Sequence, residues 1–250
     1  DDVTFPGFKI SQCSYVNALF HNKIVEDLNL KRFGYEVLTR NPSFLKLFPR
    51  GKFLSLGSDA QANRRQISKF SSHDAEAYPE YVSDYSRIGE YFDPYLLQTP
   101  PRMPPRSFSD VGKLLWAAGH TLQLRPRDMA RLVELVTTDP REILAKRFLS
   151  EEMRSAMYPD ATIGSLDTPS SLLLILHQNM GHAGGERGIW GIQRGGMGGI
   201  SKAIAGACEV HDGEIYLDCA VKSIRFSPSG KANGVILENG EEVGHLNDLA

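Results

Sequence analysis

Cysteine is scarce in this chain of 250 residues, which contains three and no Cys-x-x-Cys pair. An odd, sparse count is untypical of a secreted disulfide scaffold and points to a reducing intracellular compartment. The lack of a closely spaced pair also excludes a dithiol redox mechanism within these residues. We expect Cys13, Cys208 and Cys219 to be small apolar side chains in the protein interior.

Neither sign of charge dominates, and no apolar run is long. Lys and Arg number 28 against 30 Asp and Glu, which gives a formal charge of −2. Such a balance gives no reason to expect nucleic acid or an anionic membrane surface as a partner. The longest apolar runs, such as residues 172–176, are far shorter than the roughly 18 residues that a membrane span needs. We therefore expect a globular protein without a membrane-spanning helix.

Signatures of hydrolysis and of metal binding are missing as well. The sequence has no G-x-S-x-G motif, and its Ser, His and Asp residues show no spacing typical of a catalytic triad. His177 and His182 are five positions apart, whereas two ligands on one helix face need a spacing of three or four. We expect no metal, and we interpret residues 73–76, His-Asp-Ala-Glu, as the charged first turn of a helix.

Helical patterns dominate the first part of the chain. Apolar residues recur at helical spacing in residues 14–28, while residues 35–39 and 53–56 have the composition of short strands. The proline-rich residues 100–107 must interrupt any helix. Capping residues mark the starts of several further helices: Ser58-Asp59, Ser72, Thr138-Asp139-Pro140 and Ser150.

The pattern changes at Gly184, first to glycine and then to an alternation of period two. Residues 221–226 alternate, a Pro-Ser-Gly-Lys turn follows, and residues 233–238 form the answering strand. Asn239-Gly240 is a strong hairpin dipeptide. The sequence therefore predicts an α+β fold, with a mainly helical domain over residues 1–185 and a β-meander within residues 186–250.

The junction between these parts is rich in glycine and reads WGIQRGGMGGISKAIAGACEVHDGEIYLD from Trp190. A dinucleotide-binding loop needs a strand, G-x-G-x-x-G, a helix and an acid about 20 residues later. Gly196, Gly198 and Asp218 would supply parts of it, which leaves a nicotinamide-dependent dehydrogenase as one interpretation. Ser201, however, occupies the place of the third glycine, and a meander follows instead of a β-α-β unit. The second interpretation is a tight turn where two backbones pass closely.

The segment GIWGIQRGGMGGISKAIAGACEVHDGEIYLDCAVKSIRFSPSGKANGVILENGEE resembles the family of phytoene desaturases and flavin-containing amine oxidases. In that family a glycine turn and a helix lead to a V-x-x-I strand and a G-V-x-L strand. The segments VTFPGFKIS, IVEDLNLKRFGYEVLTRNP and ANRRQISKFSSHDAEAYPEY resemble more closely one member of it, a protein of the mitochondrial matrix.

The resemblance implies that the cofactor is FAD and that the chain is a fragment of a longer protein. Family members hold FAD through an N-terminal G-x-G-x-x-G and a C-terminal glycine-rich strand, and this chain would lie between the two. Residues 1–185 would cover the substrate, and residues 186–250 would return into the FAD-binding domain of a two-domain α/β fold. We therefore expect the isolated chain to bind FAD weakly or not at all and to be inactive.

The same resemblance suggests site residues. The backbone of Val221 would contact the adenine end of FAD, although an ordinary inward strand residue is the alternative. Gly195 and Gly196 would lie at the seam between the domains, near the flavin. Trp190 and Phe8 would line the substrate cavity, unless they only pack at the seam or belong to a linker.

The activity implied for the whole protein is removal of a hydride from a small apolar or amine-like substrate. Such chemistry needs no strong protein base, because the isoalloxazine ring accepts the electrons. The resemblance also implies a mitochondrial matrix location with protein partners there. A non-catalytic carrier or regulatory binding protein on the same fold remains the alternative.

Overall fold

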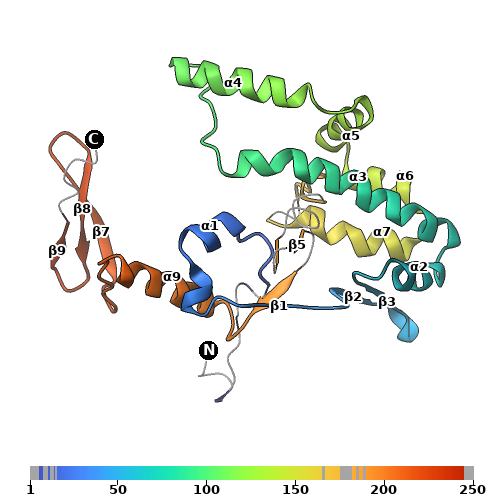
Figure 1. Ribbon diagram of the computed structural model, residues 1–250, viewed down its shortest axis with the longest axis horizontal. Helices are drawn as coiled ribbons and strands as arrows, with labels where there is room; N and C mark the ends of the chain where they lie inside the picture. The colour runs from blue at the N-terminus through green and yellow to red at the C-terminus, as the bar shows by residue number, and fades with distance from the viewer. Residues whose placement is uncertain are drawn as a thin grey trace. The chain divides into compact units, whose positions relative to one another are not determined.

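The computed structural model describes residues 6–7, 11, 14, 16–164, 167–174, 182–183, 186–187 and 190–244 (Figure 1). The chain divides into two compact units, Asp1–Ile204 and Ala205–Ala250, which are described here one at a time. The division falls at residue 204, whereas the functional boundary expected at residue 185 stays a prediction.

The first unit contains most of the described helices and several short strands. Its helices are α1 (Asn22–Asp27), α2 (Ala60–Ser68), α3 (Ser72–Leu96), α4 (Phe108–Thr121), α5 (Pro126–Thr137), α6 (Pro140–Arg147) and α7 (Glu151–Met157). Three short 3-10 helices accompany them: η1 (Leu30–Phe33), η2 (Pro49–Gly51) and η3 (Tyr158–Thr162). Its strands are β1 (Val37–Thr39), β2 (Phe44–Leu47), β3 (Phe53–Leu56), β4 (His182–Ala183), β5 (Glu186–Arg187) and β6 (Gly191–Gln193).

The strands of this unit form three antiparallel pairs, β1 with β6, β2 with β3 and β4 with β5. The first pair joins segments far apart in the sequence, with Val37 opposite Gln193. The strands expected at residues 35–39 and 53–56 are confirmed as β1 and β3. The helix expected over residues 14–28 is shorter than predicted and begins only at Asn22. Asn17 instead bridges to the backbone of Gly191, so tertiary pairing overrides the local helical pattern.

Side-chain caps explain where most of the helices begin. The side chains of Asp59, Asp139 and Ser150 accept backbone N–H groups of α2, α6 and α7, as the sequence predicted. The cap of α3 is Ser71, one residue before the Ser72 that we expected. Ser107 caps α4 in the same way.

The core of the first unit lies among α2, α3, α5, α6, α7 and the β2–β3 hairpin. Tyr81 and Tyr85 of α3 are at most 1% exposed, and their ring centroids lie 4.3 Å apart. Phe148 packs 5.1 Å from Tyr81. Burial raises the pKa of Tyr85 and of Tyr81 above the usual value of a phenol. Neither hydroxyl has a hydrogen-bond partner among the described residues.

Two buried carboxylates connect α3 to its neighbours. Asp74 lies in the first turn, as expected, but it is 0% exposed and not on a charged surface. It accepts hydrogen bonds from the Leu149 amide at 2.7 Å and from the amide and hydroxyl of Ser150 at 2.8 and 2.6 Å. These bonds fix the start of α3 against the start of α7.

Asp84 is the second buried carboxylate, with 1% exposure. Four guanidinium groups surround it, from Arg87 on α3, Arg127 and Arg131 on α5, and Arg147 on α6. The N–O distance to Arg147 is 3.1 Å. Asp84 thus holds three helices together through one side chain.

The second unit contains the end of α9 (Gly198–Val210) and a three-stranded antiparallel sheet. Its strands are β7 (Val221–Phe226), β8 (Ala232–Leu237) and β9 (Glu242–Val243), in the order β7-β8-β9. The β-meander predicted from the sequence is therefore confirmed, as is the α+β fold class. Residues 214–218, which would be the second strand in the dinucleotide interpretation, have no regular secondary structure.

The cysteines of this unit correct another expectation. Cys208 and Cys219 are exposed rather than buried, and Cys13 lies outside the described residues. Within the part of the chain that the structure describes, no helix combines the length and the apolar character needed to cross a membrane.

Candidate functional site

The glycine turn between β6 and α9 is the feature that the sequence marked most strongly. Gly195 and Gly196 have φ angles of 79° and 82°, in the left-handed region that favours glycine. A Cβ atom on Gly199 would lie 2.8 Å from the carbonyl oxygen of Arg194, so only glycine fits there. The turn reverses the chain tightly, and its glycines are explained by this local geometry.

The turn does not fit a dinucleotide diphosphate cradle, whose amides must be free for phosphate oxygens. The Met197 amide donates to the Ser11 hydroxyl at 2.9 Å. The amides of Gly199 and Ile200 donate to carbonyl groups of the turn at 2.9 and 3.0 Å. The strand before the turn, β6, also runs antiparallel to β1 and is not part of a parallel β-α-β unit. These observations favour the tight-turn interpretation.

A buried glutamine lies directly under the start of α9. Gln193 is 1% exposed, and its side-chain amide donates to the Gly34 carbonyl at 3.2 Å. Its Oε1 atom has no hydrogen-bond partner among the described residues. The side chain fills the space next to Gly199, where its Nε2 would come within 3.1 Å of an added Cβ. Gln193 therefore contributes to fixing the angle between β6 and α9.

A second polar contact supports the same region from the N-terminal segment. Asn17 is 3% exposed, and its side-chain amide donates to the Tyr35 hydroxyl at 2.9 Å. Burial raises the pKa of Tyr35, and the bond from Asn17 opposes that shift. Sequence reasoning missed Asn17 and Gln193, since an isolated polar residue in a short strand gives no signal of burial.

An ion pair closes the outer side of the turn. Arg194 forms a two-point contact with Glu36, with an Nη2–Oε1 distance of 2.9 Å. The hydrogen bond from Arg194 lowers the pKa of Glu36. Because both side chains are more than half exposed, we assign this pair an orienting role and little stability.

The remaining residues predicted for this unit are placed only in part. Trp190 is half-buried immediately before β6. Phe8 and His177 lie outside the described residues, and so does the side chain of His182. Groups of three or more His, Cys, Asp or Glu that could hold a metal do not occur among the residues that the structure describes. The roles of Trp190, Phe8 and the two turn glycines stay predictions.

Val221 belongs to the second unit and begins its edge strand, β7. It pairs with Leu237, and the Glu238 amide donates to the Ala220 carbonyl at 2.9 Å. That bond makes Val221 and Leu237 a non-hydrogen-bonded pair of an antiparallel ladder. The N–H and C=O of Val221 therefore point away from β8, toward the outer edge of the sheet. Asp218, the acid of the dinucleotide interpretation, has a φ of 57° and is also exposed.

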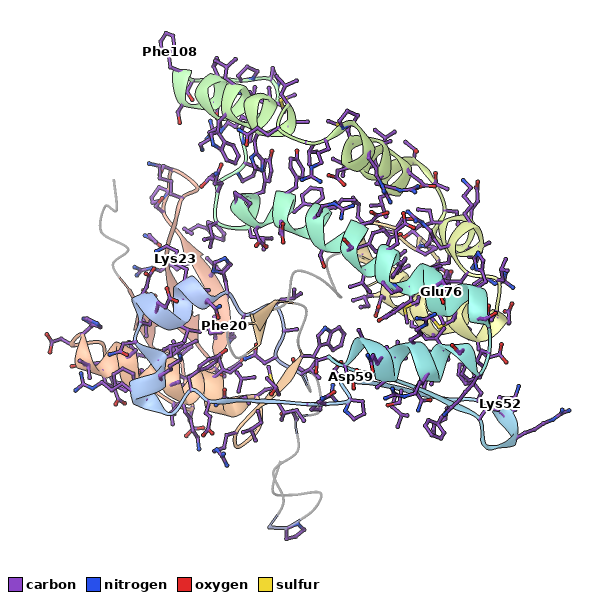
Figure 2. The ribbon with its side chains drawn as sticks, turned by 45° about the vertical axis from the view of Figure 1, so that its right-hand side comes forward. Phe20, Lys23, Lys52, Asp59, Glu76 and Phe108 are labelled. Atoms are coloured by element: carbon purple, nitrogen blue, oxygen red, sulfur yellow. The ribbon has the colours of Figure 1, made fainter. Side chains whose placement is uncertain are left out.

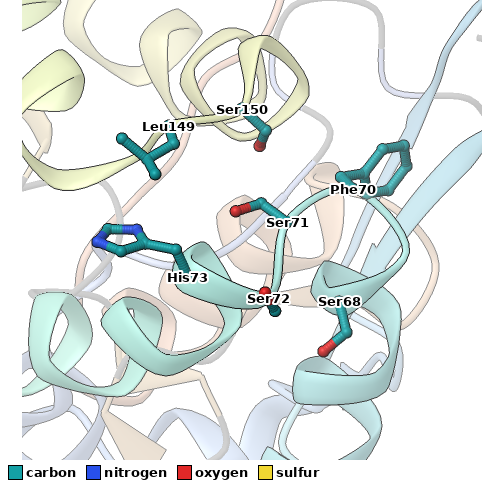
Figure 3. A pocket seen from close by; sticks show the side chains of 7 residues that line it. All are labelled: Ser68, Phe70, Ser71, Ser72, His73, Leu149 and Ser150. Atoms are coloured by element: carbon teal, nitrogen blue, oxygen red, sulfur yellow. The ribbon is translucent and has the colours of Figure 1, made fainter.

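A pocket of about 490 Å³ opens at the start of α3 (Figure 3). Its lining consists of Ser68, Phe70, Ser71, Ser72, His73, Leu149 and Ser150. The His73 ring lies 3.1 Å from Asp74, which suggests part of a catalytic triad. The hydroxyl groups of Ser71 and Ser150, however, already cap α3 and α7. The geometry therefore indicates helix termini that meet, not a nucleophilic centre.

Comparison of the sequence with known proteins identifies the family of this chain. A family model described as flavin containing amine oxidoreductase matches residues 28–248. The chain is 34% identical over 258 residues to pyridine nucleotide-disulfide oxidoreductase domain-containing protein 2 of Rattus norvegicus, and equally to that of Mus musculus. Each match covers 95% of this chain and 44% of the relative, so the chain spans less than half the length of these relatives.

Among solved structures, Rab GDI from Plasmodium falciparum has a TM-score of 0.49 and 14% identity. That comparison covers 92% of this chain and 47% of the other. The family model spans most of the sequence, and the resemblance to flavin-containing amine oxidases is confirmed. The chain belongs to the flavin containing amine oxidoreductase family.

Proposed function

We propose that the chain is part of an FAD-dependent oxidoreductase that removes a hydride from a small apolar or amine-like substrate. The observation that carries this proposal is the family match over residues 28–248. When bound, FAD would supply the electron acceptor, so the protein needs only to bind and orient the substrate and exclude water. The described residues are compatible with that division of labour, because the Asp74 carboxylate beside His73 is already occupied by hydrogen bonds from Leu149 and Ser150.

The residues that would serve FAD are those of the β7 edge. The N–H and C=O of Val221, which point away from β8, would provide one donor and one acceptor, which is what recognition of an adenine edge requires. Gly195 and Gly196 would let the backbone of the turn approach the cofactor, while Trp190 and Phe8 would contact the substrate. The glycine turn itself already uses its amides internally, so we expect FAD to depend on parts of a longer protein for its diphosphate.

The first test is the visible absorbance spectrum of the protein purified from its natural source. One FAD per chain, bleached anaerobically by an amine or an apolar C–H substrate, would support the proposal. A colourless, folded protein that refuses added FAD would overturn it and would favour a non-catalytic carrier.

A second test uses the 250-residue chain alone. We expect weak FAD binding or none by flavin fluorescence, and stoichiometric retention would contradict our view of the glycine turn. Binding of NAD that is lost in Asp218→Ala would instead support the dehydrogenase interpretation. We also propose a mitochondrial matrix location with protein partners there, for which fractionation of cells and proteolysis of intact mitochondria are the test.

A further inference from the structure

Helix α4 exposes an apolar stripe along its whole length. The large side chains Phe108, Val111 and Leu115 of α4, and Leu122 at its C-cap, are 98%, 42%, 70% and 85% exposed. They recur at intervals of three, four and seven residues, so they share one helical face. Three small residues, Gly112, Ala118 and Gly119, fill the same face and are also exposed. An ordinary surface helix carries polar residues on the face that it exposes to solvent, whereas α4 exposes apolar ones.

The orientation of α4 is fixed by contacts on its other side. The His120 ring stacks between Tyr91 of α3 and Trp116, at centroid distances of 4.9 and 5.1 Å. The hydroxyls of Thr121 and Tyr91 lie 2.8 Å apart. His120 and Thr121 of α4 thus face α3, and Figure 2 shows Phe108 at the end of α4, directed away from α3.

The segment around α4 is also basic, although the chain as a whole has a charge of −2. Residues 94–125 contain four cations, Arg102, Arg106, Lys113 and Arg125. None of the four forms an ion pair with an acid in the part of the chain that the structure describes. The single acid of the segment, Asp110, is 7% exposed. It accepts the Arg106 amide at 3.0 Å and the Ser107 hydroxyl at 2.9 Å.

We propose that α4 docks on an anionic lipid bilayer surface. The apolar stripe would enter the boundary between headgroups and acyl chains, and the cations before and after it would contact lipid phosphates. Charges act over about 8–10 Å at physiological salt, so this local excess of cations outweighs the balance of the whole chain. This occupant fits better than a second copy of α4, because pairing two stripes would bring the unpaired cations of both copies together.

The test is co-sedimentation of the 250-residue chain with lipid vesicles. We expect sedimentation with phosphatidylcholine vesicles that contain phosphatidylglycerol, much less with phosphatidylcholine alone, and release by salt. Leu115→Glu should abolish binding, whereas Leu47→Glu should not. Leu47 is the matched control, since it is 75% exposed on β2, away from α4. Far-UV circular dichroism of each variant checks that it is folded.

The contribution of charge is measured separately. The double variant Arg102→Gln, Arg106→Gln should weaken binding about 30-fold, which is the effect of removing two cations near an anionic surface. Lys31→Gln with Arg32→Gln, two exposed cations of η1, is the control and should leave binding unchanged.

Three results would overturn the proposal. The first is absence of sedimentation with the anionic vesicles, and the second is equal binding to neutral and anionic ones. The third is unchanged binding by folded Leu115→Glu. Concentration-dependent dimerisation in analytical ultracentrifugation, lost in Leu115→Glu and without vesicle binding, would assign the stripe to a second copy instead.

Discussion

Replacing Asp84 by Asn tests whether one buried carboxylate holds α3, α5 and α6 together. The change keeps the size of the side chain and removes its charge. Three of the four surrounding arginines keep another acid: Arg87 has Asp128, Arg127 has Glu80, and Arg131 has Glu134. Arg147, whose side chain is 14% exposed, has only Asp84 in the described part of the chain. The variant therefore leaves one nearly buried cation without a partner.

Breaking one partner of a buried ion pair costs about 3–5 kcal/mol, and the lower end applies because only one arginine is left unpaired. For a chain of this size, a loss of about 3 kcal/mol lowers Tm by roughly 6–12 °C. The assay is urea unfolding followed by circular dichroism, with Asp27→Asn as the control. Asp27 forms a pair with Lys23 that is more than half exposed, so its loss should cost less than about 0.5 kcal/mol.

A second substitution makes the reasoning falsifiable. Adding Arg147→Met to Asp84→Asn removes the stranded charge, and a double-mutant cycle should recover more than about 1 kcal/mol. The reasoning is refuted if Asp84→Asn lowers the free energy of unfolding by less than about 1 kcal/mol, or if adding Arg147→Met recovers none of that loss. Asp84 would then not hold α3, α5 and α6 together.

Three further predictions use the same unfolding assay. Tyr85→Phe should leave stability unchanged or raise it by up to about 1 kcal/mol, because its buried hydroxyl has no partner among the described residues; a loss above that amount would contradict this view. Gly199→Ala should destabilise the chain by about 1–3 kcal/mol, since the added Cβ meets a carbonyl oxygen at 2.8 Å, whereas Gly112→Ala, in open space on α4, should stabilise it by about 1 kcal/mol. Burial of Asp74 opposes its ionisation, but the bonds from Ser150 and Leu149 outweigh that and lower its pKa. The stability from Asp74 is thus fully present above its ordinary pKa of about 3.9 and is lost as pH falls through the folded value, so Asp74→Asn should flatten acid unfolding in that range.

Local features of the fold could be predicted from the sequence, because their causes are local. The caps at Asp59, Asp139 and Ser150 act within one helical turn, and the hairpin of β8 and β9 follows from Asn239-Gly240. The shift from Ser72 to Ser71 arises because two adjacent serines are equally suitable caps. At the glycine turn, Ser201 is a local departure from the dinucleotide pattern, and the left-handed φ angles of Gly195 and Gly196 are those of the tight turn that was the second interpretation.

Contacts between distant segments could not be predicted. Asp74 and Asp84 look like members of a solvated helix face, but their partners lie up to 76 and 63 positions away along the chain. The exposed stripe of α4 has the same spacing as a buried one, so only the structure shows which face is outward. Likewise, the overall charge concealed the basic segment around that helix.

The open edge of β7 has a consequence for solubility. Among the described residues no strand pairs with the outer side of β7, and a strand of this kind with exposed Ile224 and Phe226 is a template on which another chain can add a strand, which is how aggregation begins. Two irregularities in its register and the cation Lys222 oppose such pairing. Lys222 forms no ion pair among the described residues. Its charge disfavours the addition of a strand from another chain at this edge.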